Sequence, residues 1–524
     1  MIQTLRRILE GRLPLLTVLL LALQPLLDVF SYFTAQWGRT ALSTGLRFVL
    51  LAAVALVGLL LTKRLRVYVA FYGVALLFWA AHALNCFRIG YASPVTDAAN
   101  YLRMLSFPIF TLTFLTVLER GQALRRSVVL GFAIAFGEIL LFTALPWLLG
   151  KPVYTYEALQ VGIMGWFGVA NAQSAILVLV TPLTLYWAYK TKRYWLFLLA
   201  LALTIGLLFI TGTKFTFYSI FIITGAFAVV FALNFKLRSL KYVVPLVLVA
   251  VVAFVFRGKS PMATRESMTN YHQGVYDTLV ENSLESSTDE GTAALIRQGV
   301  QAATVPIDRL EPVRRALMTV YTDREIYGTL LKNLYDRFGV YNVMAAYDYT
   351  AEPSVLSDSR ARKGIFAHLM WQEKDFLTRC LGFEYSDMLM GGAIYDLEND
   401  FPALFYFCGY IGFALYLLIF VFFAVWVFRA LGKTLSADAR RPARPRKGLP
   451  GLLGKLCRGV TDFLTPEMAA VGMTFLLAVI AAQISGNVLR RPNVTIYFAA
   501  ASAMLYHLCM DRLQGDHPPE EAPE

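Results

Sequence analysis

The chain has 524 residues, of which 57% are hydrophobic and 16% are charged, and its formal net charge is +13. A soluble protein would carry charge on about a quarter of its residues. The apolar residues also gather in runs of about 20, the length of a membrane-crossing helix. The composition therefore excludes a soluble enzyme and predicts an all-α, multi-spanning membrane protein.

Twelve apolar runs follow one another along the chain, with one long polar interruption. The first run follows a basic segment, and no clear cleavage site comes after it, so we interpret it as a retained helix. The predicted fold is a polytopic membrane protein with about 12 transmembrane helices and one large extracytoplasmic, mostly helical loop. The expected spans cover residues 14–35, 44–62, 67–87, 99–118, 127–149, 163–188, 194–211, 214–233, 240–256, 401–428, 467–489 and 493–510.

The same pattern divides the chain into segments. We expect a membrane domain with spans 1–9 over 1–256, an extracytoplasmic loop domain over 257–400, span 10 over 401–428, a basic cytoplasmic loop over 429–466, spans 11 and 12 over 467–510, and a flexible cytoplasmic tail over 511–524. Apolar residues at helical spacing predict helices in the loop over 325–339, ended by Gly339, and over 364–382, with a packing stripe at Ile365, Leu369, Phe376 and Cys380.

The side of each loop follows from its lysines and arginines, which favour the cytoplasmic side. Every second short loop carries three of them, beginning with the N-terminal segment, whereas the loops between carry one or two. We therefore predict a plasma (inner) membrane protein with both termini in the cytoplasm. Because the positive charge is spread along one membrane side, we expect no nucleic-acid partner.

The residue types that bind metals and nucleotides are scattered. The five cysteines and five histidines form no C-x-x-C or similar ligand spacing, and the chain has no P-loop and no G-x-G-x-x-G. We expect no metal and no cofactor.

A short turn, "TGTK" at 211–214, separates the seventh and eighth spans. Gly212 is expected to end one helix, and Thr213 to cap the next, which places Lys214 in a first helical turn. Free N–H groups and a lysine at a helix start favour an anion such as phosphate. The alternative is a lysine that only anchors the helix end at the membrane surface.

Two acidic residues, Asp28 and Glu138, lie inside predicted spans, where ionisable groups are costly and face a cavity or a partner. Arg103 in the fourth span is a possible partner of Asp28. Asp97 and Arg47 are equally compatible with an interfacial position.

Three carboxylates in "YDLEND" directly precede the tenth span: Asp396, Glu398 and Asp400. Acidic residues at this place either cap the helix or serve a reaction at the membrane surface. A carboxylate that takes a proton from a hydroxyl needs only to lie within hydrogen-bond reach of it.

Several segments together resemble the O-antigen ligase and O-antigen polymerase superfamily of bacterial envelope glycosyltransferases. "TGTK" takes the place of the family's T-G-S-R turn, and Glu398-Asn399 takes the place of its His-Asn pair, with Gly409 eleven residues beyond Glu398 and "YIG" following. "SRARKGIFAHLMW" at 359–371 and "GWFGVAN" at 165–171 resemble two further family segments. This chain has Lys for the family's Arg and Glu for its His.

The resemblance implies transfer of a glycan from an undecaprenyl-pyrophosphate-linked donor to an acceptor glycan or lipid. We expect this transfer to need no metal, because the sequence has no metal-ligand clusters and offers lysine and arginine for the phosphate charge. It implies Glu398 as the base or the group that orients the acceptor, with Asp400 as second choice. It assigns Lys214 to stabilisation of the leaving group. The residues expected to bind the pyrophosphate or glycan are Lys214, Thr213, Arg360, Arg362, Asn399, Arg103 and Asp28.

Two alternatives remain open. Polymerisation and ligation are not distinguished by the sequence. A transporter or flippase for a lipid-linked glycan would also span the membrane many times, although this chain shows no internal repeat and has a large outer loop.

Overall fold

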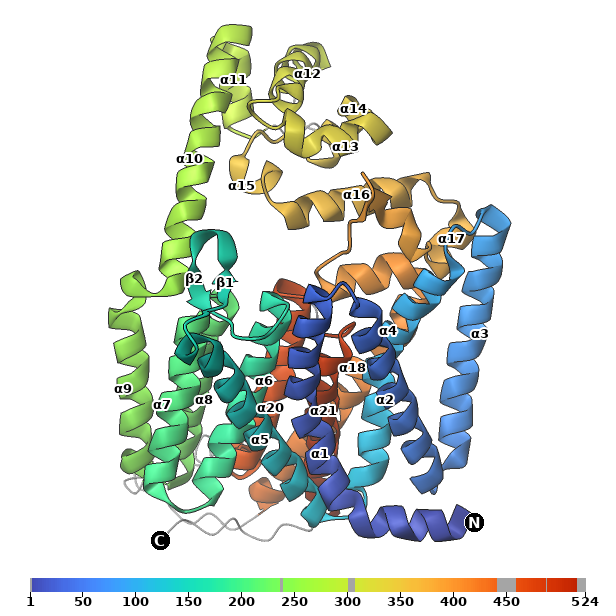
Figure 1. The fold of residues 1–524 in the computed structure, drawn as a ribbon, viewed down its shortest axis with the longest axis vertical. Coiled ribbons are helices and arrows are strands. Elements are labelled where there is room, and N and C mark those ends of the chain that lie inside the picture. The colour runs from blue at the N-terminus through green and yellow to red at the C-terminus, as the bar shows by residue number, and fades with distance from the viewer. Residues whose placement is uncertain (1, 236–238, 300–306, 441–458, 487, 516–524) are drawn as a thin grey trace. The chain divides into compact units, whose positions relative to one another are not determined.

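The computed structural model describes residues 2–235, 239–299, 307–440, 459–486 and 488–515 (Figure 1). Residues 441–458 of the predicted basic loop after span 10, and the end of the predicted tail from residue 516, lie outside these residues. The chain divides into two compact units. Unit 1 comprises Met1–Gly73, Tyr101–Thr264 and Leu415–Glu524, and unit 2 comprises Val74–Asn100 and Arg265–Ala414.

Unit 1 is the larger helical bundle. It contains α1 (Ile2–Gln36), α2 (Thr40–Leu61), the start of α3 (Leu65–Ile89), most of α4 (Pro94–Leu118), α5 (Gln122–Leu148), α6 (Ala170–Lys190), α7 (Tyr194–Thr211), α8 (Lys214–Phe235), α9 (Leu240–Val255), the second part of α18 (Asp400–Arg440), α20 (Pro466–Ile484) and α21 (Pro492–Gln514). Among the described residues, 11 helices are long and apolar enough to cross a membrane. The predicted all-α polytopic fold is confirmed.

The remaining predicted span corresponds to α9, which is apolar but has only 16 residues. The hydroxyl of Tyr194, the first residue of α7, donates to the backbone oxygen of Lys241 at the start of α9. At the other end, Gly212 after α7 lies against Pro261, shortly after α9. α9 and the short segment after it therefore extend from one end of α7 to the other, which is the length of a predicted span.

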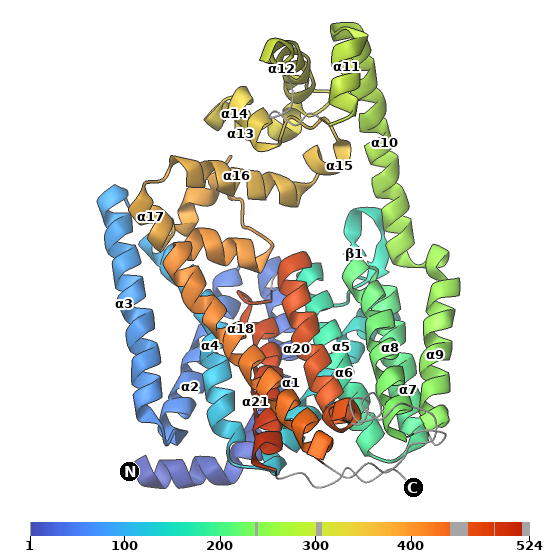
Figure 2. The ribbon, with the colours of Figure 1, turned by 180° about the vertical axis from the view of Figure 1, so that it is seen from behind.

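At the centre of unit 1 lies α6, which packs against α5, α7, α8, α20 and α21 (Figures 1 and 2). Nearly all of its side chains are buried. Some of these are polar, and two threonines form hydrogen bonds within the helix: the hydroxyls of Thr181 and Thr184 donate to the carbonyl oxygens four residues earlier. Such bonds allow polar residues in a water-free interior.

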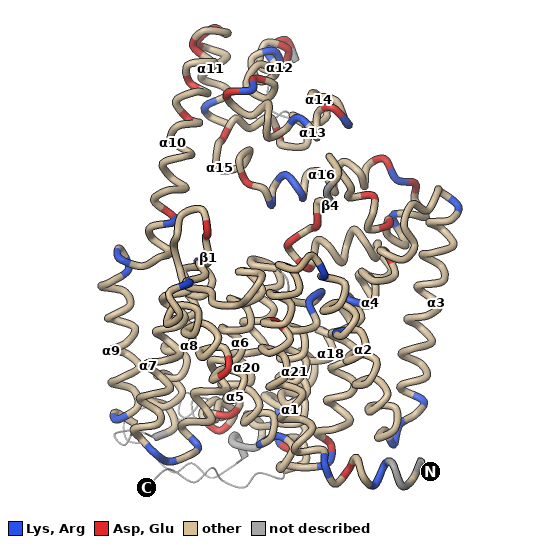
Figure 3. Tube along the Cα trace, in the orientation of Figure 1, with Lys and Arg blue, Asp and Glu red and all other residues tan. Residues whose placement is uncertain are grey.

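Basic residues gather at one end of the unit 1 helices (Figure 3). There, Arg120 at the end of α4 donates to the carbonyl oxygen of Leu61 at 2.6 Å and to Glu10 at 3.3 Å. Arg125 in the first turn of α5 donates to Asp511 near the end of α21 at 3.1 Å. These contacts bring the start of α1 and the end of α21 to the same end of the unit.

The opposite end of unit 1 carries a small hairpin that the sequence analysis did not predict. Its strands β1 (Tyr154–Tyr156) and β2 (Val161–Ile163) are antiparallel and are joined by the short 3-10 helix η1 (Glu157–Leu159). A second 3-10 turn, η3 (Arg257–Lys259), follows α9. Because the hairpin uses residues up to Ile163, α6 begins only at Ala170, later than the predicted start at 163.

Unit 2 is built mainly from the long loop. Its elements are α10 (Pro261–Ser287), α11 (Glu290–Arg297), α12 (Ile307–Thr322), α13 (Gly328–Phe338), α14 (Val340–Ala346), α15 (Pro353–Leu356), α16 (Ser359–Glu373), α17 (Phe376–Leu381), the 3-10 helix η4 (Tyr385–Met388), and the short strands β3 (Leu389–Met390) and β4 (Ala393–Ile394). The end of α3, the first turns of α4 and the start of α18 complete it. The prediction of a mostly helical loop is confirmed.

One predicted helix of the loop is confirmed and one is wrong. α13 ends before Gly339 as expected. The predicted helix over 364–382 is instead split into α16 and α17, because Asp375 caps α17 by accepting a hydrogen bond from the Thr378 N–H at 2.9 Å. The break turns Phe376 outward, and its side chain is 78% exposed, so it does not belong to a packing stripe.

Candidate functional site

The TGTK turn of unit 1 has the predicted local structure. Gly212 adopts a left-handed conformation with φ +81 and ends α7. The Thr213 hydroxyl oxygen accepts a hydrogen bond from the Thr216 N–H at 3.3 Å, which caps α8. Thr213 is buried, whereas Lys214 is exposed in the first turn of α8. The turn therefore presents a positive side chain beside a helix start, where an anion is stabilised.

The β1–β2 hairpin rests on this turn through two glycines. A Cβ at Gly162 would lie 2.5 Å from the carbonyl oxygen of Thr211, and a Cβ at Gly212 would lie 3.4 Å from the Cα of Gly162. The first distance is too short for any side chain. Because both positions also have positive φ, only glycine fits without strain. The hairpin and the TGTK turn are thus held in direct backbone contact.

The second charged feature of unit 1 surrounds Asp28. Its carboxylate accepts hydrogen bonds from Arg47 at 2.5 Å and from the side-chain amide of Asn493 at 2.9 and 3.0 Å. The predicted partner, Arg103, is not the cation found beside Asp28. Arg47 takes that place because it lies in the second turn of α2, and α2 packs antiparallel to α1. This buried network ties α1, α2 and α21 together.

In unit 2, Glu398 lies between two cations. Its Oε2 accepts a hydrogen bond from Arg360 at 2.7 Å, and its Oε1 accepts one from Lys363 at 2.8 Å. Residues three apart on a helix share a face, so α16 presents Arg360 and Lys363 together. The Glu398 side chain is 24% exposed. Burial alone would raise the pKa of Glu398, but hydrogen bonds from Lys363 and Arg360 outweigh it and hold the pKa below its ordinary value.

The other predicted residues of unit 2 have different surroundings. Arg362 points away from that face and donates to the backbone oxygen of Leu330 at 3.0 Å. Asp400 is completely buried as the first residue of α18. Asn399 is half-buried, and its backbone oxygen accepts the Ala403 N–H at 3.1 Å. Arg360 and Glu398 of the predicted set meet directly. Lys363 was not predicted, and its i+3 spacing from Arg360 was the available signal.

The start of α18 is fixed by a close backbone approach. Gly409 has φ +63 and ψ −172 inside the helix, and a Cβ there would lie 2.5 Å from the carbonyl group of Cys380 and from the nitrogen of Gly382. A Cβ at Gly382 would likewise collide with the backbone of Phe407. The glycine eleven residues beyond Glu398 therefore has a structural reason: it lets α18 cross the end of α17.

An aromatic cluster covers this crossing. The ring of Trp371 lies 5.0 Å from that of Phe405 and 5.5 Å from those of Tyr406 and Tyr410, measured between centroids, and Phe383 is 6.3 Å away. Trp371 belongs to α16 and lies about two helical turns beyond Lys363. The cluster therefore holds α16 against α18. This packing supports the position of the two cations relative to Glu398.

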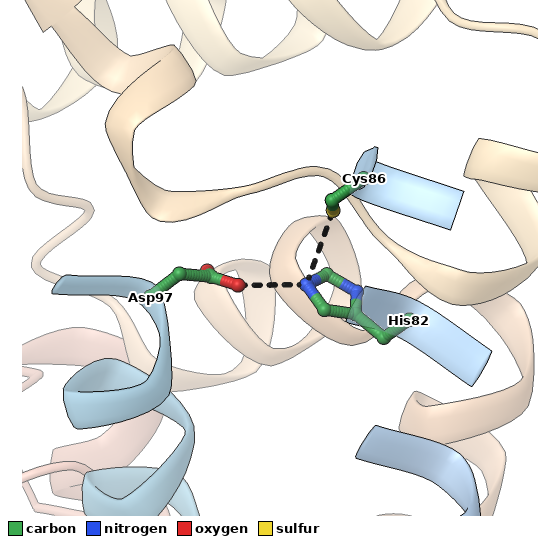
Figure 4. Close-up of side chains that lie close together, drawn as sticks. All are labelled: His82, Cys86 and Asp97. Carbon is green, nitrogen blue, oxygen red and sulfur yellow. Dashed lines mark hydrogen bonds and ion pairs between the residues drawn. The ribbon is translucent and has the colours of Figure 1, made fainter. Parts of the chain in front are cut away.

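A further polar cluster of unit 2, also not anticipated, joins α3 and α4 to the segment after α17 (Figure 4). His82 Nε2 lies 2.9 Å from Asp97 Oδ2, and His82 Nδ1 lies 2.9 Å from the carbonyl oxygen of Leu381. Asp97 also accepts hydrogen bonds from the Tyr91 hydroxyl at 2.6 Å and from the Tyr385 N–H at 2.9 Å. Both ring nitrogens of His82 and both carboxylate oxygens of Asp97 therefore have hydrogen-bond partners.

Cys86 completes the cluster, with Sγ 3.5 Å from His82 Nε2. The ligand atoms of His82, Cys86 and Asp97 lie within 4.8 Å of one another, and these residue types also bind metals. A nucleophilic triad would place Cys and Asp on opposite ring nitrogens, whereas here both face Nε2. Since the hydrogen bonds already satisfy the imidazole and the carboxylate, we interpret the cluster as a polar clamp.

A comparison with protein families agrees with the fold. Residues 12–439 match the family described as "O-antigen ligase like membrane protein". No curated protein matches the chain. The match covers most of the chain, including all of unit 2 and unit 1 as far as residue 439, and the chain therefore belongs to this family.

Proposed function

We propose that this O-antigen ligase-like protein transfers a glycan from an undecaprenyl-pyrophosphate-linked donor to a hydroxyl of an acceptor glycan or lipid, as a polymerase or ligase of cell-surface polysaccharide. The observation that carries the proposal is the Arg360–Glu398–Lys363 cluster. It combines two cations, which suit a pyrophosphate, with a carboxylate, which can accept the proton of an attacking hydroxyl.

Before the donor binds, the cations and the carboxylate neutralise each other. The pyrophosphate competes with Glu398 for Arg360 and Lys363, because phosphate oxygens are equally good acceptors and carry more charge. When the cations turn to the donor, the influence that lowers the pKa of Glu398 is reduced, and its basicity rises. In this proposal the donor itself converts Glu398 from a paired carboxylate into a base.

The transfer step then balances as follows. The acceptor oxygen forms a bond to the anomeric carbon of the donor sugar, and the bond between that carbon and the pyrophosphate oxygen breaks. Glu398 takes the acceptor proton. The electron pair stays on the lipid pyrophosphate, whose developing charge Arg360 and Lys363 stabilise.

We assign Thr213 and Lys214 a separate candidate phosphate site of unit 1, on the basis of the helix start and the exposed lysine. Asn399 is kept as a candidate acceptor contact beside Glu398. The buried Asp400 and the turned-away Arg362 are better suited to holding α18 and α13 in place than to touching substrate. For Asp28 and Arg103 we propose only a structural role in unit 1, without direct contact to the donor.

The same proposal places the basic helix ends of unit 1 in the cytoplasm and the long loop outside a bacterial plasma membrane. It also requires no divalent metal, because arginine and lysine supply the positive charge that a metal would otherwise provide.

The decisive experiment uses full-length protein in detergent micelles with the lipid-linked oligosaccharide pool of its host strain and a strong chelator. We expect a new glycosidic product, seen by gel and mass spectrometry, and a loss of product with Lys363→Ala. Lys332→Ala is the matched control, because Lys332 is an exposed lysine that pairs with Asp336 on α13.

A flippase needs two membrane faces and forms no new covalent bond. Movement of intact donor across proteoliposomes, together with no product in micelles, would therefore refute the transferase. Activity that returns only with one added divalent metal would refute the metal-independent step alone.

A further inference from the structure

Unit 1 contains a cavity of about 680 Å³ at the end opposite its basic helix ends. It lies between the last turn of α1, the segment that leads into β1, and the segment before α6. Its volume falls within the range of about 300–1,000 Å³ that is usual for small-ligand sites. We call it the hairpin cavity.

The lining of the hairpin cavity is mixed. Tyr32 and Tyr154 are half-buried aromatic side chains, and the fully buried Phe167 lies beneath them. Gln36 and Glu157 add exposed polar groups from opposite walls. Aromatic surfaces combined with a few polar side chains suit a ligand that has both apolar faces and hydroxyl groups.

The charged residues of the lining further restrict the type of ligand that the hairpin cavity can bind. Lys151 and Glu157 both border the cavity and oppose each other in charge. A strongly anionic ligand would meet Glu157, and an acyl chain would leave these charged groups without water. A sugar residue, which is neutral and amphipathic, fits both conditions.

One wall residue also lacks a partner. Thr155 is 92% buried, since its relative exposure is 8%, and among the described residues its hydroxyl has no hydrogen-bond partner. An unsatisfied buried hydroxyl is unfavourable by about 1–3 kcal/mol. A hydroxylated ligand that reached Thr155 after a rotation of its side chain would remove this cost.

The hairpin that carries Tyr154 and Thr155 is the one that rests on the TGTK turn through Gly162 and Gly212. The cavity wall and the candidate phosphate contact at Lys214 therefore belong to one rigid backbone assembly within unit 1. A phosphate bound at this turn would therefore have the hairpin directly beside it.

We propose that the hairpin cavity binds the sugar chain of the lipid-linked donor, an inference that rests on the function proposed above. Tyr154 and Tyr32 supply the surfaces on which a sugar ring packs, and Glu157 and Gln36 accept or donate hydrogen bonds to its hydroxyls. This site recognises the glycan, separately from the groups that hold the pyrophosphate.

The test measures binding without chemistry. The probe is the reducing oligosaccharide released by mild acid from the lipid-linked pool of the host strain, which carries no pyrophosphate. Full-length protein in nanodiscs is titrated with it by saturation-transfer NMR. We expect saturable binding that weakens at least tenfold in Tyr154→Ala and in Glu157→Gln, and that is largely retained in Tyr154→Phe.

Gln160→Asn serves as the control, because Gln160 lies in the same hairpin with a positive φ that asparagine tolerates, and it does not line the cavity. Wild-type binding that Tyr154→Ala and Glu157→Gln leave unchanged would refute the hairpin cavity. So would no saturable binding by the wild type.

Failure of the proposed function remains distinguishable from failure of this site. Glu398→Gln should lose transfer in the micelle assay yet bind the free oligosaccharide as the wild type does. Protein that binds the oligosaccharide through Tyr154 but forms no product would sustain the cavity and refute the transferase.

Discussion

Lys363 Nζ lies 2.8 Å from Glu398 Oε1, one helical turn along α16 from Arg360, which occupies the other carboxylate oxygen. Because both carboxylate oxygens accept hydrogen bonds from cations, Glu398 without bound donor is a stabilised anion and a weak base. In the proposed function, the same two cations bind the diphosphate of the donor. Activity should therefore depend on how strongly the three side chains hold each other before the donor arrives.

The first prediction concerns pH. Lys363 and Arg360 hold the pKa of Glu398 below its ordinary value, so the acid limb of kcat/KM, which reports the free enzyme, should lie at a lower pH than that of an unpaired glutamate. Lys363→Ala removes one of the lowering influences, so the limb should move to higher pH while the plateau falls. Rates measured in micelles between pH 4 and 8 would show this. A limb that does not move relative to Lys332→Ala would show that Glu398 is not the titrating base.

The second prediction separates the neighbouring acids. Glu398→Gln keeps the size and hydrogen-bonding capacity of the side chain but removes its basicity, so glycan transfer should fall by roughly 10²–10⁴. Asp396→Asn should have a mild effect. Polysaccharide is scored in cells that lack their own copy, at matched protein levels. Full-length polymer from Glu398→Gln would mean that the acidic cluster only caps α18.

The third prediction distinguishes an anion site from a membrane anchor at the TGTK turn. Lys214→Ala should reduce transfer by roughly 10²-fold, the usual cost of losing one group that stabilises developing charge. Lys190→Ala is the control, since Lys190 is also an exposed lysine at a helix end. If anchoring is the whole role, the two variants should behave alike.

The fourth prediction tests the backbone crossing in unit 2. Gly409→Ala places a Cβ 2.5 Å from three backbone atoms and forces alanine into a glycine conformation, so the folded protein should be recovered poorly or melt earlier in detergent. Gly432→Ala, on the same helix with open space around it, should be neutral or stabilising by up to ~1 kcal/mol. Equal melting of the two variants would contradict the crossing.

The fifth prediction concerns orientation. A cysteine at Ser286, exposed near the end of α10, should react with a membrane-impermeant maleimide in intact cells, whereas a cysteine at Ser436 on α18 should react only after lysis. The opposite pattern would reverse the assignment of the two membrane sides. It would also remove the basis for placing the reaction outside the cell.

Features that depend only on a short stretch of sequence could be predicted. The spans follow from hydropathy, and the turn at Gly212 and Thr213 follows from the backbone preferences of those residues. The β1–β2 hairpin was missed because its strands have three residues each and stand next to an apolar run. The break at Asp375 was missed because the apolar spacing continues through it.

The partners of charged residues could not be predicted, because they depend on packing. Arg47 and Arg103 are both arginines within spans, and only the antiparallel contact of α1 and α2 selects Arg47 as the partner of Asp28. Lys363 was overlooked for the same reason, since its meaning appears only when Glu398 comes to lie against α16. Spacing along one helix showed which side chains share a face, but not what that face would meet.

The polar clamp in unit 2 has a consequence for biosynthesis. His82 and its acceptor Leu381 are 299 residues apart, so at about 5–20 residues per second the ribosome needs roughly 15–60 s to supply the second after the first. During that interval His82 and Asp97 can already contact each other, but the Leu381 carbonyl that His82 contacts and the Tyr385 N–H that donates to Asp97 do not yet exist. The helices α3 and α4 are therefore made before these two contacts can form. The polar clamp is completed only late in assembly, after the segment with Leu381 and Tyr385 has been made.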